Sequence, residues 1–143
     1  MSKGLPPRVG VAVIVVKSGK VLLGRRKGAH GEGTWAFPGG HLAFGEAIET
    51  CACREVMEET GLTISDLKVG PFTNDVFAEE KKHYVTIYVA ARYAQGRLAI
   101  REPDKCEHWD WFYWHHLPRP RFLSLENLLR LRFDPIAYLN NPE

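Results

Sequence analysis

GHLAFGEAIETCACREVMEETGL, residues 40–62, is the most informative stretch of this sequence. Strong helix formers from Ala47 to Glu59 predict a helix. The helix is expected to end at Thr60-Gly61, where a glycine suits a C-terminal cap. A glycine-rich turn, Pro38-Gly39-Gly40, comes shortly before the helix and ends a short strand predicted at 34–37. The stretch therefore predicts a loop–helix–loop unit.

Three carboxylates converge on one face of this predicted helix. Glu55 and Glu59 are four residues apart, and Glu55 and Glu58 are three apart, so they share a face. Like charges at that spacing repel, and a hard divalent cation removes the repulsion. Magnesium fits such oxygen ligands, with manganese as a substitute, and the Gly39 carbonyl is a further candidate ligand. Taken alone, the three acids also fit a solvated, glutamate-rich helix.

The complete pattern is G-x5-E-x7-R-E-U-x-E-E-x-G-U, in which U is apolar, and every position matches. Arg54 lies two turns after Glu46, so we expect the two to form a structural ion pair. The pattern is that of the Nudix box, and the chain resembles the Nudix hydrolases. The resemblance implies an α/β fold, an α/β/α sandwich with a mixed sheet. It also implies Mg²⁺ bound by Glu55, Glu58 and Glu59, with Glu55 or a nearby carboxylate as base.

Segments outside the box resemble one MutT-type branch of that family. They include Leu22–Arg26, Phe37–Leu42, His83–Thr86 and Cys106–Trp111. That branch contains the thiopurine-nucleotide diphosphatase and a plant cytosolic Nudix pyrophosphohydrolase, and it forms homodimers. The resemblance covers about residues 8–136. It implies a small nucleotide substrate: a nucleoside triphosphate, an oxidised purine nucleotide or dihydroneopterin triphosphate.

Several residues are candidates for holding the substrate. The guanidinium groups of Arg25 and Arg26 suit phosphate, although a solvated basic turn is the simpler alternative. Gly40 and His41 follow the glycine turn, where phosphate contact and a purely structural role are both open. The resemblance implies a base slot built from Phe37, Thr86 and the segment 122–125, with Phe122, Leu123 and Leu125 as contacts. Glu107 is a further candidate acid.

Composition bounds the remaining possibilities. The chain has 143 residues, a net charge of +2 and 45% hydrophobic residues, which fits one domain spanning 1–143. A balanced charge gives no support for a nucleic acid polymer or a membrane surface as partner. No apolar run is long enough to span a bilayer, and no signal-peptide core is present, which favours the cytoplasm. The three cysteines do not form the spaced pairs of a zinc site, and their odd number predicts reduced thiols.

The remaining sequence predicts strands mixed with helices. Val9–Val16 and Val21–Leu23 read as a hairpin, with further strands near 67–77, 83–93 and 106–114. Asp75–Lys82 reads as a charged loop, and a last helix is expected over Leu123–Arg132. The leading functional hypothesis is a nucleoside triphosphate pyrophosphohydrolase. The alternatives are a hydrolase of a linked nucleoside diphosphate, such as ADP-ribose or a nucleotide sugar, and a non-catalytic nucleotide-binding domain.

Overall fold

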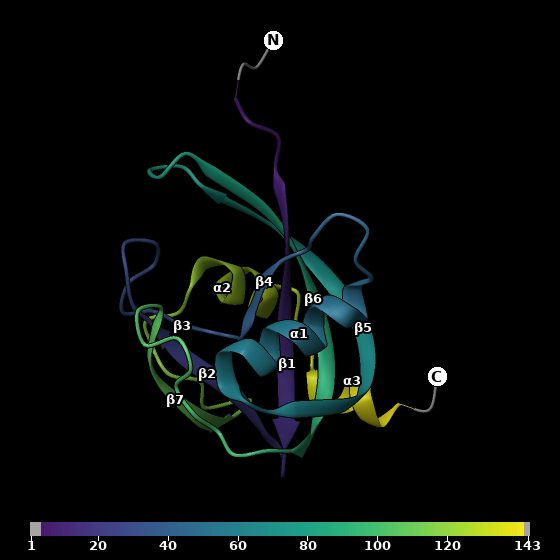
Figure 1. Cartoon of the computed structure of the whole chain (residues 1–143). Helices are drawn as coiled ribbons and strands as arrows, with labels where there is room; N and C mark the ends of the chain where they lie inside the picture. The colour runs from purple at the N-terminus through teal and green to yellow at the C-terminus, as the bar shows by residue number, and fades with distance from the viewer. Residues whose placement is uncertain (1–3, 142–143) are drawn as a thin grey trace.

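The computed structural model describes residues 4–141, which form a seven-stranded mixed sheet with helices on both faces (Figure 1). The strands are β1 (Arg8–Lys17), β2 (Lys20–Arg26), β3 (Trp35–Ala36), β4 (Gly39–His41), β5 (Thr63–Phe77), β6 (Lys82–Gln95) and β7 (Cys106–Tyr113). The helices are α1 (Ile48–Thr60), α2 (Leu123–Arg130) and α3 (Pro135–Asn140). The order β3-β2-β1-β6-β5 includes one parallel pair, β1 with β6.

The sheet separates two apolar cores, which confirms the expected three-layer arrangement. Alternate residues of β1 point to opposite faces, and both faces are covered. Val13 and its neighbours on one face pack against α1, where Val56 is fully buried. Ile14 on the other face packs against α2, where Leu128 is fully buried. Burial on both faces explains why β1 is a continuous β-branched run.

The β1–β2 hairpin forms as predicted, with a two-residue turn at Ser18 and Gly19. Both residues have positive φ, 52° and 78°, as such a tight hairpin turn requires. After the turn the two strands stay paired only at Val16↔Val21 and Lys17↔Lys20. The rest of β2 pairs with β3 and β7. Along the first half of β1, the neighbouring strand on that side is β4 and not β2. The sheet therefore divides into two arms.

Three predicted boundaries were wrong. The glycine turn is itself a strand, β4, because the diverging β2 leaves an edge of β1 free to pair. The strands β5 and β6 take in both ends of the predicted charged loop and leave only residues 78–81 between them, and Asp75 is fully buried. The chain also forms α3 after α2, with Asp134 accepting hydrogen bonds from the N–H groups of Ile136 and Ala137.

Among the helices of residues 4–141, none combines the length and apolarity needed to cross a bilayer.

Candidate active site

Helix α1 crosses directly over β4, and this contact depends on glycine. A Cβ atom at Gly40 would overlap the carboxylate of Glu55, and one at Gly39 would overlap the carbonyl of Val11. The Gly39 N–H donates to Oε2 of Glu59 at 3.3 Å. Gly40 thus allows the Glu55 carboxylate to lie against the strand backbone, and Gly39 allows β4 to lie close to β1.

Glu55 and Glu59 are in unfavourable surroundings for two ionised acids. Burial, followed by the neighbouring Glu55 carboxylate, raises the pKa of Glu59 far above its usual range. The side chain of Glu55 is also largely buried, with 14% of its surface exposed. A pair of this kind holds both negative charges only when a cation compensates them. The chemistry of the pair therefore fits a hard divalent ion.

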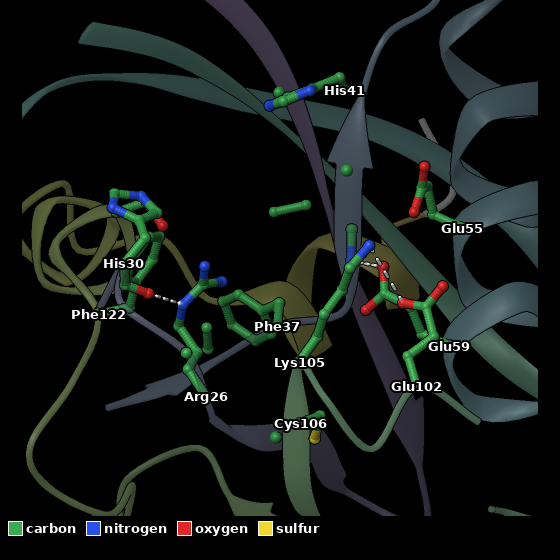
Figure 2. A pocket seen from close by; sticks show the side chains of 18 of the residues that line it. Arg26, His30, Phe37, His41, Glu55, Glu59, Glu102, Lys105, Cys106 and Phe122 are labelled. Atoms are coloured by element: carbon green, nitrogen blue, oxygen red, sulfur yellow. Dashed lines mark hydrogen bonds and ion pairs between the residues drawn. The ribbon is translucent and has the colours of Figure 1, made fainter. Parts of the chain in front are cut away.

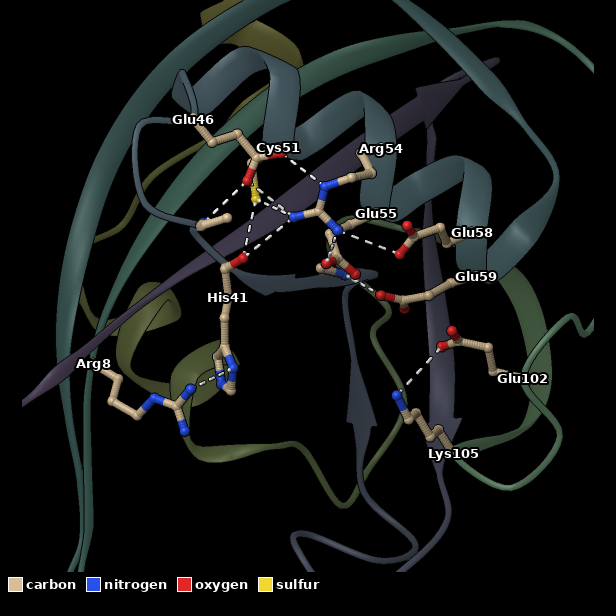
Figure 3. A network of polar contacts seen from close by, with 12 residues as sticks. Arg8, His41, Glu46, Cys51, Arg54, Glu55, Glu58, Glu59, Glu102 and Lys105 are labelled. Atoms are coloured by element: carbon tan, nitrogen blue, oxygen red, sulfur yellow. Dashed lines mark hydrogen bonds and ion pairs between the residues drawn. The ribbon is translucent and has the colours of Figure 1, made fainter.

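Arg54 ties the box together, as its position in the pattern predicts (Figure 3). Its Nε donates to Glu46 at 2.7 Å, and one Nη donates to Glu55 at 2.8 Å. The hydrogen bonds from Arg54 lower the pKa of Glu46 to about 2, and the bond to Glu46 raises the pKa of Arg54. Arg54 also lies 3.4 Å from Glu58, whose side chain is 49% exposed. The guanidinium thus orients the start of the helix and the carboxylate of Glu55.

The box acids do not form a closed cage. Within residues 4–141, no group of three or more acidic, histidine or cysteine side chains is arranged to enclose a metal ion. Glu58 faces Arg54 and solvent, while Glu55 and Glu59 face each other. Two converging carboxylates suit magnesium, which keeps several water ligands and shares its shell with substrate phosphates. Metal binding by Gly39 and Glu58 stays a prediction.

A cavity of about 650 Å³ lies between the two arms of the sheet, beside the acids (Figure 2). Its size is within the range of about 300–1,000 Å³ that is usual for small-molecule sites. One wall is aromatic: the His30 ring lies 4.6 Å from Phe77 and 5.2 Å from Phe122. On the next side, the His41 ring stacks on Tyr84 at 5.5 Å. Such walls suit a planar ring system.

Arg26 supplies a positive charge inside this cavity (Figure 2). Its Nε donates to the carbonyl of His30 at 3.0 Å, and its guanidinium carbon lies 4.2 Å from the centre of the Phe122 ring. Burial lowers the pKa of Arg26. The ion pairs of the described residues do not include Arg26. A half-buried guanidinium outside the ion pairs of the described residues is suited to bind an anionic ligand.

Most of the predicted substrate residues line the cavity, but three do not. The lining includes Arg26, Phe37, Gly40, His41, Thr86 and Phe122. Arg25 alternates to the other side of β2 and forms an ion pair with Glu107 at 3.4 Å. Leu125 is buried in the core under α2, and Leu123 is not among the lining residues, whereas Ser124 between them is. The structure thus gives Arg25, Leu123 and Leu125 no place at the cavity.

The structure also brings in residues that the sequence did not single out. Glu102 and Lys105, which lie 4.0 Å apart, line the cavity beside Glu59 (Figure 2). They come from the polar break before β7, so Glu102 and not Glu107 is the additional acid near the box. Tyr84 shares a strand face with Thr86, and this alternation was a usable signal. The sequence carried no comparable signal for His30.

Comparisons with known proteins agree with this geometry. A family model of the NUDIX domain matches residues 6–131. The oxidized purine nucleoside triphosphate hydrolase of Danio rerio is 42% identical over 82 residues, covering 57% of this chain and 53% of that protein. The match thus spans about half the length of that relative. The ADP-ribose pyrophosphatase of Methanocaldococcus jannaschii is 30% identical over 130 residues, 91% of this chain and 69% of that protein.

A solved structure is similar to this chain over nearly the whole fold. The MutT NUDIX hydrolase from Burkholderia pseudomallei superimposes with a TM-score of 0.80 at 31% identity. The superposition covers 90% of this chain and 98% of that one. The complete box, the divided sheet with α1 over β4 and these matches lead to one conclusion: the chain belongs to the Nudix hydrolase family.

Proposed function

We propose that this protein is a divalent-metal-dependent nucleoside triphosphate pyrophosphohydrolase, which releases a nucleoside monophosphate and pyrophosphate. The observation that carries the proposal is one cavity that joins the paired carboxylates of Glu55 and Glu59 to the half-buried guanidinium of Arg26. In one part of the cavity the acids would bind a cation. The guanidinium would bind phosphate oxygens, and the aromatic wall would contact the base. A polyphosphate joined to a planar base meets all three requirements.

The metal in this proposal is magnesium, with manganese as a substitute. Glu55 and Glu59 would hold it, with Glu58 and the Gly39 carbonyl as the further predicted ligands. Such an ion supplies Lewis-acid chemistry at the phosphate oxygens. The water that attacks phosphorus gives its proton to a carboxylate, for which Glu55 or a neighbouring acid is positioned. The phosphoanhydride bond breaks, and its electron pair stays on the leaving phosphate oxygen.

One alternative substrate class is supported by a specific observation. The ADP-ribose pyrophosphatase relative aligns over 91% of this chain, more than the triphosphate hydrolase relative does. A linked diphosphate carries less negative charge than a triphosphate and needs room for a second sugar. With the base at the aromatic wall, that second sugar would extend beyond the acids, and the substrate screen below distinguishes the two classes.

The test is a substrate screen on the full chain with magnesium. Purine and pyrimidine triphosphates, ADP-ribose, a nucleotide sugar and a 5′-triphosphorylated oligoribonucleotide are compared by kcat/KM. Products are separated to distinguish pyrophosphate from orthophosphate. We expect the highest kcat/KM for a nucleoside triphosphate, with pyrophosphate as product. A higher value for ADP-ribose would transfer the assignment to linked diphosphates, and binding without turnover of any compound would indicate a non-catalytic domain.

A further inference from the structure

A fully buried carboxylate belongs to the lining of the cavity and has no part in the proposed reaction. Asp75 on β5 is fully buried, and its carboxylate accepts three hydrogen bonds. The donors are the hydroxyl of Thr86 at 2.5 Å, the hydroxyl of Thr73 at 3.1 Å and the Nδ2 group of Asn127 at 2.9 Å. The ion pairs of residues 4–141 give it no cationic partner. The three donors to its carboxylate are therefore neutral groups.

The direction of the three bonds to Asp75 is fixed, whereas either hydroxyl can be the donor in the 3.3 Å contact between Thr73 and Tyr88. Nη1 of Arg130 donates to Oδ1 of Asn127 at 2.8 Å, so the Asn127 amide presents its NH₂ group to Asp75. A carboxylate only accepts, so a hydroxyl that touches it must donate. A threonine hydroxyl has one hydrogen. Once Thr86 donates that hydrogen to Asp75, the hydroxyl oxygen of Thr86 can only accept a hydrogen bond from any other partner.

Thr86 is the member of this cluster that faces the ligand. It lines the cavity and keeps 8% of its surface exposed, whereas Asp75, which also lines the cavity, is fully buried and Thr73 is not among the lining residues. Gly10 is its neighbour on β1, and a Cβ there would lie 3.9 Å from the Thr86 hydroxyl oxygen. The missing side chain at Gly10 leaves that oxygen accessible from the cavity.

The position of Thr86 relative to the acids decides which part of a nucleotide reaches it. Glu55 lies against Gly40 on β4, and Thr86 is on β6, with β1 between the two strands. Two strand spacings amount to roughly 10 Å. If the proposed function places the phosphates at Glu55, a base that extends toward Thr86 would present the edge opposite its sugar. In guanine that edge carries the N1–H and the 2-amino group, which are donors.

We propose that Asp75 is a positioning residue that fixes the Thr86 hydroxyl as a hydrogen-bond acceptor and so selects bases that present an N–H donor, such as guanine. This inference rests on the proposed function for the orientation of the nucleotide. A base without a donor at that edge leaves the Thr86 oxygen buried and unpaired, which is costly. Asp75 thus acts on specificity through Thr86, without touching the substrate.

The test compares GTP with 1-methyl-GTP, which lacks the N1–H donor, in four proteins. Wild-type enzyme should prefer GTP by about tenfold or more in kcat/KM. In D75N the amide can donate to Thr86, whose hydrogen is then free to point to the cavity, so the preference should fall to about threefold or less. T86V, which keeps shape and loses the hydroxyl, should show the same fall. T73V removes the longer bond from Thr73 to Asp75 and the 3.3 Å contact with the Tyr88 hydroxyl, while the Thr86 bond stays intact, so its preference should stay within about twofold of wild type.

Binding of the monophosphates GMP and 1-methyl-GMP, measured by calorimetry without metal, gives a readout independent of turnover. The same pattern across the four proteins is expected there. If wild-type enzyme hydrolyses triphosphates but D75N and T86V keep its full preference, the inference about Asp75 is wrong and the proposed function stands. If no triphosphate is hydrolysed while monophosphate binding shows the pattern, the proposed function is wrong and the inference stands. An equal fall in T73V would overturn the inference, because the effect would then follow from loosening the cluster.

Discussion

At the scale of single residues, the three box acids differ more than their spacing suggests. Glu55 and Glu59 contact the glycines of β4, while Glu58 is 49% exposed beside Arg54. We expect E55Q and E59Q to lower kcat by about 100-fold or more, because each removes a charge from the cation site and a proton acceptor. E58Q should have a smaller effect. Steady-state kinetics with magnesium, with circular dichroism to verify folding, measures this. Equal losses in all three variants would contradict the distinction.

Arg25 and Arg26 form a second test, because they are neighbours with opposite surroundings. Arg26 stacks on Phe122 inside the cavity, and Arg25 pairs with Glu107 outside it. Lysine retains the charge but loses the planar fork and the stacking. R26K should therefore raise KM for a nucleoside triphosphate by about tenfold. R25K is the matched control and should leave KM within about twofold, since exposed ion pairs contribute little. A larger effect from R25K would place the phosphates on the other side of β2.

At the scale of elements, the site depends on how closely α1 approaches β4. A methyl group at Gly40 overlaps the Glu55 carboxylate and must push the helix away or rotate the acid. We expect G40A to destabilise the protein by about 1–3 kcal/mol. Chemical denaturation measures the free energy of unfolding. The control is G10A, whose added Cβ meets its nearest atoms at 3.9 Å, an ordinary contact, so its change should be about 0.5 kcal/mol or less. If G40A is no more destabilising than G10A, the helix and strand are not in close contact.

The region where α1 approaches β4 also shows which features the sequence could predict and which it could not. Helix α1 was predicted within one residue at each end, because its composition and the Gly61 cap are local signals. The box also predicted the Arg54–Glu46 ion pair. β4 was missed, since its existence depends on an edge of β1 that β2 vacates. Asp75 was placed in a loop for the same reason: it pairs with Tyr84 across β5 and β6 and accepts a hydrogen bond from Asn127, 52 residues away in the chain. Local patterns do not contain such long-range pairings.

At the scale of the whole molecule, the acid pair makes stability depend on pH and metal. The pKa of Glu59 is raised in the folded chain from an ordinary value of 4.5. A raised carboxyl pKa means that the folded state binds the proton more tightly than the unfolded state. Its stability contribution is therefore complete below pH 4.5 and is lost as pH rises through the raised pKa. In excess chelator, Tm should fall over this range.

Magnesium should reverse that loss, because it binds the ionised pair in the folded state only. The increase in Tm on adding magnesium should therefore grow from pH 5 to pH 9. E59Q lacks the titrating group and should show a flatter pH profile in chelator. Differential scanning calorimetry on both proteins measures these effects. A metal-induced increase that is the same at both pH values, or as large in E59Q, would show that the pair is not the metal site.

The divided sheet has a consequence for how such a protein changes over evolutionary time. Residues that contact the acids come from β4 and α1, which are adjacent in sequence, whereas the base wall is assembled from the β5–β6 turn region, the loop before β3 and the start of α2. Mutations in those distant segments can be inherited and selected without disturbing the box. A lineage can then drift from one nucleotide to another while its reaction chemistry stays intact, and recombination within the chain can exchange one set of segments independently of the other.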